Sequence, residues 1–246
     1  MGFFSDMIRP IIDFALPPRC PICGIIVESD HRFCLSCWDD LDFLTEPWCA
    51  GCGRPFAFEQ EDDALCISCL QERQIHDGVR AVVAYDEHSS ILPMRLKYGG
   101  RLGLADLIAA HLMRFVPGLP DNTLIMPVPL HRWRLWSRGF NQSVLIARSL
   151  EKQSGFDMDC ASLLRRHATP VLRSMSAKQR EKVVKNVFAI AADRRSTIEG
   201  RTVILVDDVY TTGATAGACS RLLRECGADR ILIFCWARVL KGQADS

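Results

Sequence analysis

Four copies of one short cysteine motif constrain the fold of this chain more than any other feature. In each copy two cysteines are separated by two residues, and all four copies fall between residues 20 and 69. The copies are Cys20/Cys23, Cys34/Cys37, Cys49/Cys52 and Cys66/Cys69. This spacing lets two thiolates of one tight turn reach the same metal ion, and two such turns complete a tetrahedral site. The segment therefore predicts two structural zinc ions, each held by four thiolates, with no ligand position open for catalysis.

Two ways of combining the pairs are open. Sequential pairing would place Cys20, Cys23, Cys34 and Cys37 around one ion, and interleaved pairing would mix the pairs. A disulfide framework fits less well, because no secretory signal is recognisable and we expect a cytoplasmic protein. Four copies outside a βαβ pattern do not resemble a redox site. So short a segment cannot bury a sufficient core, and each zinc would contribute roughly 10–16 kcal/mol to its folding.

The charge of the chain is divided unevenly along its length. Residues 1–77 contain 5 lysines and arginines against 14 acidic residues, whereas residues 78–246 contain 25 against 15. This asymmetry predicts an N-terminal helix and double zinc ribbon over 1–77, followed by a separate domain over 78–246. The acidic ribbon favours docking of a protein over contact with nucleic acid.

The first residues of the chain are apolar on one side. Residues 2–16 predict an amphipathic helix that packs onto the protein, with a membrane-surface helix as the alternative. No apolar run is long enough for a transmembrane helix.

A strand-to-helix turn near the C-terminus carries the strongest chemical signal. An apolar run predicts a buried strand over 202–206, Asp207 and Asp208 follow it, and a Thr-Thr-Gly turn leads into a helix over 214–226. Free N–H groups at a helix start bind phosphate, and Gly213 allows the backbone to approach closely. Paired carboxylates accept hydrogen bonds from vicinal hydroxyls. Together these features predict a site for a phosphorylated sugar.

This motif resembles the phosphoribosyl pyrophosphate (PRPP) signature of type I phosphoribosyltransferases. The resemblance implies that Asp207 and Asp208 hold the ribose hydroxyls, that the following loop wraps the 5′-phosphate, and that Mg²⁺ binds with PRPP. The residues it assigns to PRPP are Val206, Asp207, Asp208, Thr211, Thr212, Gly213, Ala214 and Thr215.

The remainder of residues 78–246 alternates between strand and helix patterns. We expect strands at 79–85, 124–128, 202–206 and 231–236, and helices at 102–115, 141–152 and 214–226. Such alternation predicts an α/β fold with a mostly parallel sheet flanked by helices, as in type I phosphoribosyltransferases. Ligands of these sheets bind at the carboxyl ends of the strands, where the acid pair lies.

Two further segments narrow the resemblance to one family. Pro127–Arg132 runs on to Arg138–Gln142, and Arg95–Gly100 lies upstream. With the cysteine-rich start, these segments are similar to the ComF family of competence-associated proteins, in which a double zinc ribbon precedes a phosphoribosyltransferase-like domain. The resemblance implies further PRPP contacts at Lys97, Pro129, Leu130, His131 and Arg138.

Residues 131–185 are strongly basic, with 12 lysines and arginines against 4 acidic residues. Such a stretch is typical of a lid that closes over PRPP, of a surface for single-stranded DNA, or of a solvated helix face. The candidate residues are Arg165, Arg166, Arg173, Lys178, Arg180, Lys182 and Lys185. Val171 and Val183 stand where the family's lid motifs often have polar residues. Arg138, Asn141 and Gln142 are candidates for contact with a base or a second phosphate, or for capping and packing of the helix that begins there.

Three functions are open from the sequence. Asp207, Asp208 and Lys97 are the candidate catalytic residues if the chain transfers a phosphoribosyl group from PRPP to a nitrogen nucleophile. The chain could instead sense PRPP without turnover, or act as a DNA-binding adaptor whose acidic ribbon docks a helicase-like partner. For each, the resemblance implies an accessory role in competence, single-stranded DNA uptake or recombination.

Overall fold

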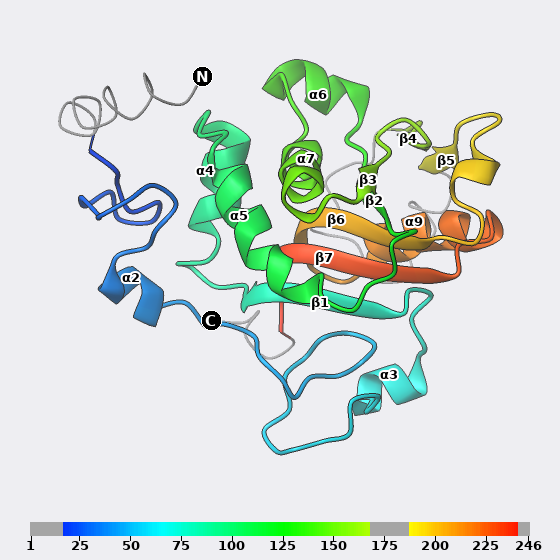
Figure 1. Ribbon diagram of the computed structural model, residues 1–246, viewed down its shortest axis with the longest axis horizontal. Coiled ribbons are helices and arrows are strands. Elements are labelled where there is room, and N and C mark those ends of the chain that lie inside the picture. Colours follow the sequence, from blue (N-terminus) through cyan, green and yellow to red (C-terminus); the bar gives the residue numbers. More distant parts are fainter. Residues whose placement is uncertain (1–16, 168–186, 241–246) are drawn as a thin grey trace.

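A five-stranded parallel sheet forms the centre of the computed structural model, which describes residues 17–167 and 187–240 (Figure 1). The strand order is β1-β7-β6-β2-β3, and every neighbouring pair runs parallel. The strands are β1 (Gly78–Ala84), β2 (Leu124–Pro127), β3 (Asp157–Met158), β6 (Thr202–Tyr210) and β7 (Arg230–Arg238). The two central strands, β6 and β7, are buried along almost their whole length, as an all-parallel sheet requires.

Helices cover both faces of this sheet. On one face lie α4 (Ile91–Tyr98), α5 (Leu104–Leu112), the 3₁₀ turn η1 (Met113–Phe115) and α7 (Gln142–Ser154). The helix α9 (Ala214–Glu225) covers the other face (Figure 1). Neighbouring residues of β6 alternate between the two cores, because Ile204 and Val206 belong to the cluster of α5 and α7, and Val203 and Leu205 to that of α9.

Smaller elements complete the described part of the chain. They are α2 (Leu35–Asp39), α3 (Ile67–Gln71), α6 (Arg132–Arg138), the antiparallel pair β4 (Leu163–Arg165) and β5 (Phe188–Ile190), and η3 (Arg195–Thr197). In Figure 1, α6 lies above α7, and β4 and β5 lie at the same end of the molecule. In the described ranges no helix is both long and apolar enough to cross a membrane.

The cysteine-rich segment packs along β1, the edge strand of the sheet. The amide of Val79 donates to the carbonyl of Gly51 at 3.1 Å, and the amide of Ala84 donates to the carbonyl of Asp42 at 2.8 Å. Gly53 has a φ of +67° and lies so close to the Val79 carbonyl that any side chain would clash with it. The segment therefore satisfies backbone groups that an exposed edge strand would leave unpaired.

Several predictions concern residues outside the described ranges. They are the helix over 2–16, the altered lid positions Val171 and Val183, and the lid or nucleic-acid candidates Arg173, Lys178, Arg180, Lys182 and Lys185.

Within the described ranges the elements predicted for residues 78–246 are present, and α4, β3, β4 and β5 are present in addition. The strand predicted over 202–206 continues to Tyr210, so the acid pair lies inside it, because backbone pairing with β7 continues to Arg238. The helix predicted over 102–115 is divided between α5 and η1. The helix α6 was not predicted, since exposed arginines and tryptophans give it no apolar periodicity.

Candidate functional site

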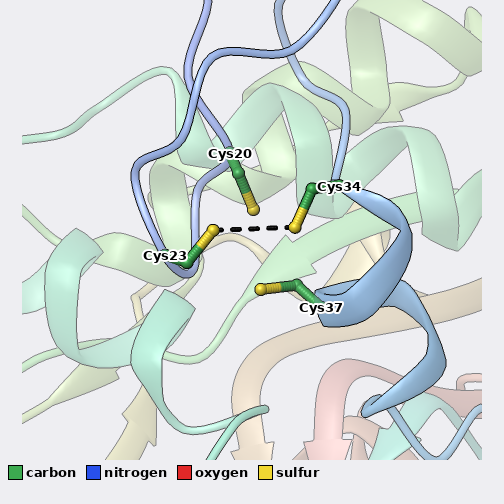
Figure 2. A group of neighbouring side chains, drawn as sticks. All are labelled: Cys20, Cys23, Cys34 and Cys37. Carbon is green, nitrogen blue, oxygen red and sulfur yellow. Dashed lines mark hydrogen bonds between the residues drawn. The ribbon is translucent and has the colours of Figure 1, made fainter.

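The eight cysteines form two compact clusters whose sulfur atoms lie within 4.8 Å of one another. Cys20, Cys23, Cys34 and Cys37 form the first cluster, so the pairing is sequential (Figure 2). The second consists of Cys49, Cys52, Cys66 and Cys69.

Sulfur spacing distinguishes zinc ligands from disulfides. The Cys23 and Cys34 sulfurs are 3.6 Å apart, and those of Cys52 and Cys66 are 3.7 Å apart. A disulfide would need about 2.0 Å, whereas a tetrahedral zinc with bonds of about 2.3 Å places its sulfurs about 3.8 Å apart. The two clusters therefore fit two four-thiolate zinc sites, and all twelve cysteines are free thiols.

The first turn of α7 holds the acid pair of β6. The Ser143 hydroxyl donates to Asp207 Oδ1 at 3.2 Å, and Gln142 Nε2 donates to Asp208 Oδ1 at 3.3 Å. The Lys97 ammonium, from the last turn of α4, forms an ion pair with the Asp208 carboxylate. Three elements distant in sequence therefore meet at the carboxyl end of β6, as expected for a parallel sheet.

The carboxylates of Asp207 and Asp208 are neighbours, and the Lys97 ammonium pairs with only one of them. Burial, together with the negative charge of Asp208, raises the pKa of Asp207 to about 7, although Lys97 opposes the rise. The charged form of Asp207 is therefore less favourable in the ligand-free fold than in water, and this lowers the stability of the fold as the pH rises toward 7. Hydroxyl donors or a cation brought by a ligand would relieve this cost.

The predicted phosphate loop connects β6 to α9. Thr211 and Thr212 are exposed, and Gly213 has a φ of +79° at the position before the first residue of α9. A side chain at Gly213 would collide with the hydroxyl of Tyr210, so the loop lies directly against this ring. Among the residues that the structure describes, no side chain caps the N-terminus of α9, so its first N–H groups can bind an anion. Ala214 and Thr215 form the first helical turn and are half-buried.

The predicted pyrophosphate loop follows β2. Pro129 and Leu130 are half-buried there. His131 caps α6, because its Nδ1 accepts a hydrogen bond from the Trp133 amide at 3.3 Å. Asn141 caps α7 and also donates to the carbonyl of Val128 at 3.0 Å, which ties the loop to the helix. Asn141 and Gln142 thus bind protein groups, in agreement with the capping and packing alternative.

A cationic cavity of about 490 Å³ lies beside the acid pair. Lys97, Arg134 and Arg138 line it, and no acidic residue of the described ranges does so. Arg138 Nη2 donates to the Tyr98 hydroxyl at 2.8 Å, and its guanidinium lies 4.9 Å from the centre of that ring. Arg138 is therefore held in place by an aromatic residue for which the sequence gives no specific role.

A larger cavity, of about 750 Å³, lies between α6, α7 and β4. Leucines and Phe140 give it an apolar wall. Its charged residues are Arg132, Arg148, Arg165 and Arg166. Of the predicted lid residues, Arg165 and Arg166 therefore line a cavity, and the guanidinium of Arg165 lies 5.4 Å from the Phe188 ring centre.

Four cysteines lie outside the two clusters, and three of them are buried. Cys219 and Cys235 are fully buried and Cys226 is almost so. Cys160 is exposed and borders the larger cavity, because it lies in the loop after β3.

The sequence did not single out Ser143 or Tyr98 as site residues. Ser143 has no recognisable motif, and its place in the first turn after the Asn141 cap is the signal that could have found it. Tyr98 lies in the segment Arg95–Gly100 that supports the family resemblance, which is the corresponding signal for this residue.

Comparison with known families agrees with this architecture. Residues 11–72 match the double zinc ribbon domain, and residues 155–246 match the phosphoribosyl transferase domain. The fold and the site therefore define a class: proteins with a type I phosphoribosyltransferase fold and an N-terminal double zinc ribbon.

Relatives narrow this class to one family. Competence protein F of Haemophilus influenzae is 30% identical over 229 residues, which cover 89% of this chain and 96% of the relative. DNA utilization protein YhgH of Salmonella typhi is 32% identical over 231 residues, or 92% of this chain and 99% of the relative. A crystal structure of adenine phosphoribosyltransferase has a TM-score of 0.38 at 18% identity, over 61% of this chain and 76% of that one. The chain belongs to the competence protein F (ComF) family.

Proposed function

We propose that residues 78–246 bind PRPP with Mg²⁺, or a closely related sugar phosphate, and that residues 1–77 form a zinc-dependent unit that docks a protein partner. The position of Lys97 carries the proposal, because its ammonium pairs with Asp208 and the same residue lines the cationic cavity with Arg134 and Arg138. Carboxylates suited to ribose hydroxyls thus lie next to three cations suited to a pyrophosphate. PRPP has this arrangement, since its pyrophosphate is attached directly to the ribose.

The phosphate loop supplies the third contact of the proposed site. The free N–H groups at the start of α9 would bind the 5′-phosphate. Because Gly213 has no side chain, the loop can pack directly against Tyr210. Mg²⁺ would neutralise pyrophosphate charge beside Asp207 and Asp208. Bound hydroxyls would donate hydrogen bonds and this ion would add positive charge, and both would favour the ionised form of Asp207, which burial and the Asp208 charge disfavour.

The larger cavity supports transfer to an acceptor. A nitrogen atom of the acceptor would form a bond to C1 of the ribose while the bond from C1 to the pyrophosphate oxygen breaks. Lys97, Arg134 and Arg138 would stabilise the charge that develops on the leaving group. The apolar wall around Phe140 and the arginines beside it favour a planar acceptor that carries a negative charge. A regulator that binds PRPP without turnover would release no pyrophosphate. An assay of pyrophosphate release therefore distinguishes a transferase from such a regulator.

Replacing Asp207 by Asn tests the sugar-phosphate site. The amide keeps an oxygen for Ser143 and for the Asp208 amide but removes the charge, so the ligand-free variant should be at least as stable as the wild type at pH 8. PRPP and Mg²⁺ at about 100 times the dissociation constant should stabilise the wild type by about 2.7 kcal/mol. We expect this stabilisation to be lost in the variant, as measured by thermal unfolding of zinc-loaded protein.

The exposed Asp229, on the loop before β7, provides the matched control. Asp229→Asn should keep the full stabilisation by PRPP. An equal shift in all three proteins would assign PRPP to a different site, and the absence of any shift in the wild type would refute PRPP binding.

A second candidate function is binding of single-stranded DNA, for which the helix α6 provides the specific observation. Trp133 and Trp136 are 72% and 92% exposed there, and Arg132 and Arg134 lie on the same short helix. Exposed aromatic rings beside cations are the usual means of binding a single strand without sequence preference. The names of the relatives, competence protein and DNA utilization protein, agree with such a role.

Replacing Trp136 by Ala tests this second function. Loss of one stacking ring should weaken binding of a labelled oligo-dT by about 1–3 kcal/mol, which is roughly 5- to 150-fold. Fluorescence anisotropy at several salt concentrations measures both the affinity and its salt slope. Phe58→Ala, at a similarly exposed aromatic residue of the cysteine-rich segment, should leave the affinity unchanged. Equal losses in both variants, or no measurable binding by the wild type, would rule out a stacking surface on α6.

A further inference from the structure

The second half of each cysteine cluster has the same local structure. The helices α2 and α3 are both five residues long, and each begins directly after the third cysteine of its cluster. These N-cap cysteines, Cys34 and Cys66, have nearly equal backbone angles, with φ −72° and ψ 163° in one and φ −70° and ψ 160° in the other. Trp38 of α2 therefore corresponds to Leu70 of α3, since each lies four residues after its N-cap cysteine.

The two helices differ in what they pack against. The ring centre of Trp38 lies 4.4 Å from that of Phe43 and 6.0 Å from that of His111 on α5, so α2 is attached to other parts of its own chain. Leu70, in contrast, is 68% exposed, and Ile67, which shares its face of α3, is 75% exposed. The position that Trp38 uses for contact within the chain is thus available on α3 to another molecule.

The chain on both sides of α3 is acidic. Residues 57–73 contain five acidic residues against one arginine, and all five acidic residues are exposed. A zinc ion held by the four thiolates of the second cluster would add a net charge of about −2. The apolar face of α3 therefore lies in a negative surface, and it fits a partner whose exposed apolar residues are accompanied by cations.

The helix α6 presents a surface with these properties. Trp133 and Trp136 are three residues apart, so they share a face, and both are strongly exposed. Arg132 and Arg134 belong to the same helix, and residues 123–150 contain four arginines and no acidic residue. Exposed rings accompanied by cations on α6 thus complement exposed aliphatic side chains accompanied by carboxylates at α3.

One copy of the chain cannot bring these two surfaces together. In Figure 1, α6 lies above the central sheet and α3 lies below it. Contact between them therefore requires two copies. Because the two surfaces differ, such a contact is heterologous, and it leaves one surface of each kind free in a pair of copies. The opposite net charges of residues 1–77 and 78–246 favour the same head-to-tail arrangement.

We infer that the protein partner of the zinc-dependent unit is a second copy of this chain, with α3 of one copy packed against α6 of the next. Ile67 and Leu70 would contact Trp133 and Trp136, and the arginines of α6 would face the carboxylates around α3. An oligonucleotide bound to α6 would compete with this contact, so the two uses of α6 exclude each other. The identity of the partner rests on the proposed docking role of residues 1–77.

Analytical ultracentrifugation of the zinc-loaded full chain tests the inference. At low ionic strength the average mass of the wild type should rise with protein concentration. The association should weaken in about 1 M salt, where the Debye length falls to about 3 Å. Ile67→Lys places a cation against the arginines of α6, and Trp136→Ala removes one of its exposed rings. Each variant should weaken the association at least about tenfold.

A mixture of these two variants tests the head-to-tail geometry. Ile67→Lys retains the α6 surface and Trp136→Ala retains the α3 surface, so the two proteins together have one intact contact. At concentrations where each variant alone is monomeric, equal amounts of the two should form a dimer and nothing larger. A monomeric mixture would overturn the inference. Dimers of Trp136→Ala alone would also overturn it, because they would indicate a symmetric contact of α3 with itself.

Leu35→Lys, at the corresponding exposed position of α2, is the matched control and should associate like the wild type. Equal weakening by Leu35→Lys would contradict the inference, because any added cation would then have the effect assigned to α3. Since Ile67 lies between two zinc ligands, Glu72→Lys, just after α3, replaces Ile67→Lys with the same expectation if that variant does not retain both zinc ions.

Two further outcomes distinguish the inference from the function on which it rests. A wild type that is monomeric at every concentration would refute self-association alone, because residues 1–77 could still dock a different protein. Association that persists after a chelator has removed all zinc would refute the zinc-dependent docking unit itself, and with it the inference.

Discussion

Removing zinc should expose the edge of the central sheet. Two four-thiolate sites contribute roughly 10–16 kcal/mol each to folding of the segment that contains them. This segment accepts hydrogen bonds from β1, through the carbonyls of Gly51 and Asp42. In chelator-treated protein we therefore expect the amides of Val79 and Ala84 to lose protection from hydrogen exchange by several orders of magnitude. Amides of the central β6–β7 pairing should stay protected, because they do not depend on the segment.

A single-residue version of this experiment uses Cys49→Ser. Cys49 is fully buried and its sulfur accepts from the amides of both Cys52 and Cys66, so a serine there should abolish binding of one zinc. Cys160→Ser, at an exposed cysteine outside both clusters, is the control and should keep both ions. Persistent protection of Val79 and Ala84 after complete zinc removal would show that the segment folds through its apolar contacts alone.

Replacing Lys97 by Met should be among the most destabilising changes in residues 78–246. It leaves the buried Asp208 carboxylate without its cation, next to a second carboxylate. Removing one partner of a buried pair typically costs 3–5 kcal/mol, and the partial exposure of the Lys97 side chain reduces this to about 2–3 kcal/mol. We expect a loss of that size in the free energy of urea unfolding at pH 8.

The pH dependence of this loss follows from the acid pair. Because the folded-state pKa of Asp207 is raised to about 7, its charge is present at pH 8 and largely absent at pH 5. The loss caused by Lys97→Met should therefore shrink as the pH falls through this window. Adding Asp208→Asn to Lys97→Met should restore much of the stability at pH 8, since the carboxylate that Lys97 paired is then neutral and Asp207 no longer faces a second negative charge.

Lys152→Met, at an exposed lysine of α7, provides the baseline and should change stability by less than about 0.5 kcal/mol. If Lys97→Met and the double variant with Asp208→Asn lose the same free energy of unfolding, the ion pair does not determine stability at this site. Lys97→Met should in either case bind PRPP more weakly under the proposed function, because it also removes a cation from the cavity.

Local sequence was sufficient to predict each feature whose geometry is determined by a few neighbouring residues. The spacing within each cysteine pair limits its members to one metal ion, and Asn141 marks the start of α7 by capping it. The apolar run before Asp207 is a buried strand, and Gly213 adopts the positive φ that its turn requires. Each of these features depends on residues that are neighbours in the chain, so periodicity and turn chemistry are enough to predict it.

The tertiary structure alone decided which distant residues meet. The sequence predicted both members of the Lys97–Asp208 pair but not their contact, and it left sequential and interleaved cysteine pairing open. It also did not associate Arg238 with Tyr210, although the guanidinium lies 5.7 Å from the centre of that ring. These contacts follow from the order of strands in the sheet and from packing of the cysteine-rich segment against β1. Strand order results from burial summed over the whole core, and no local pattern records it.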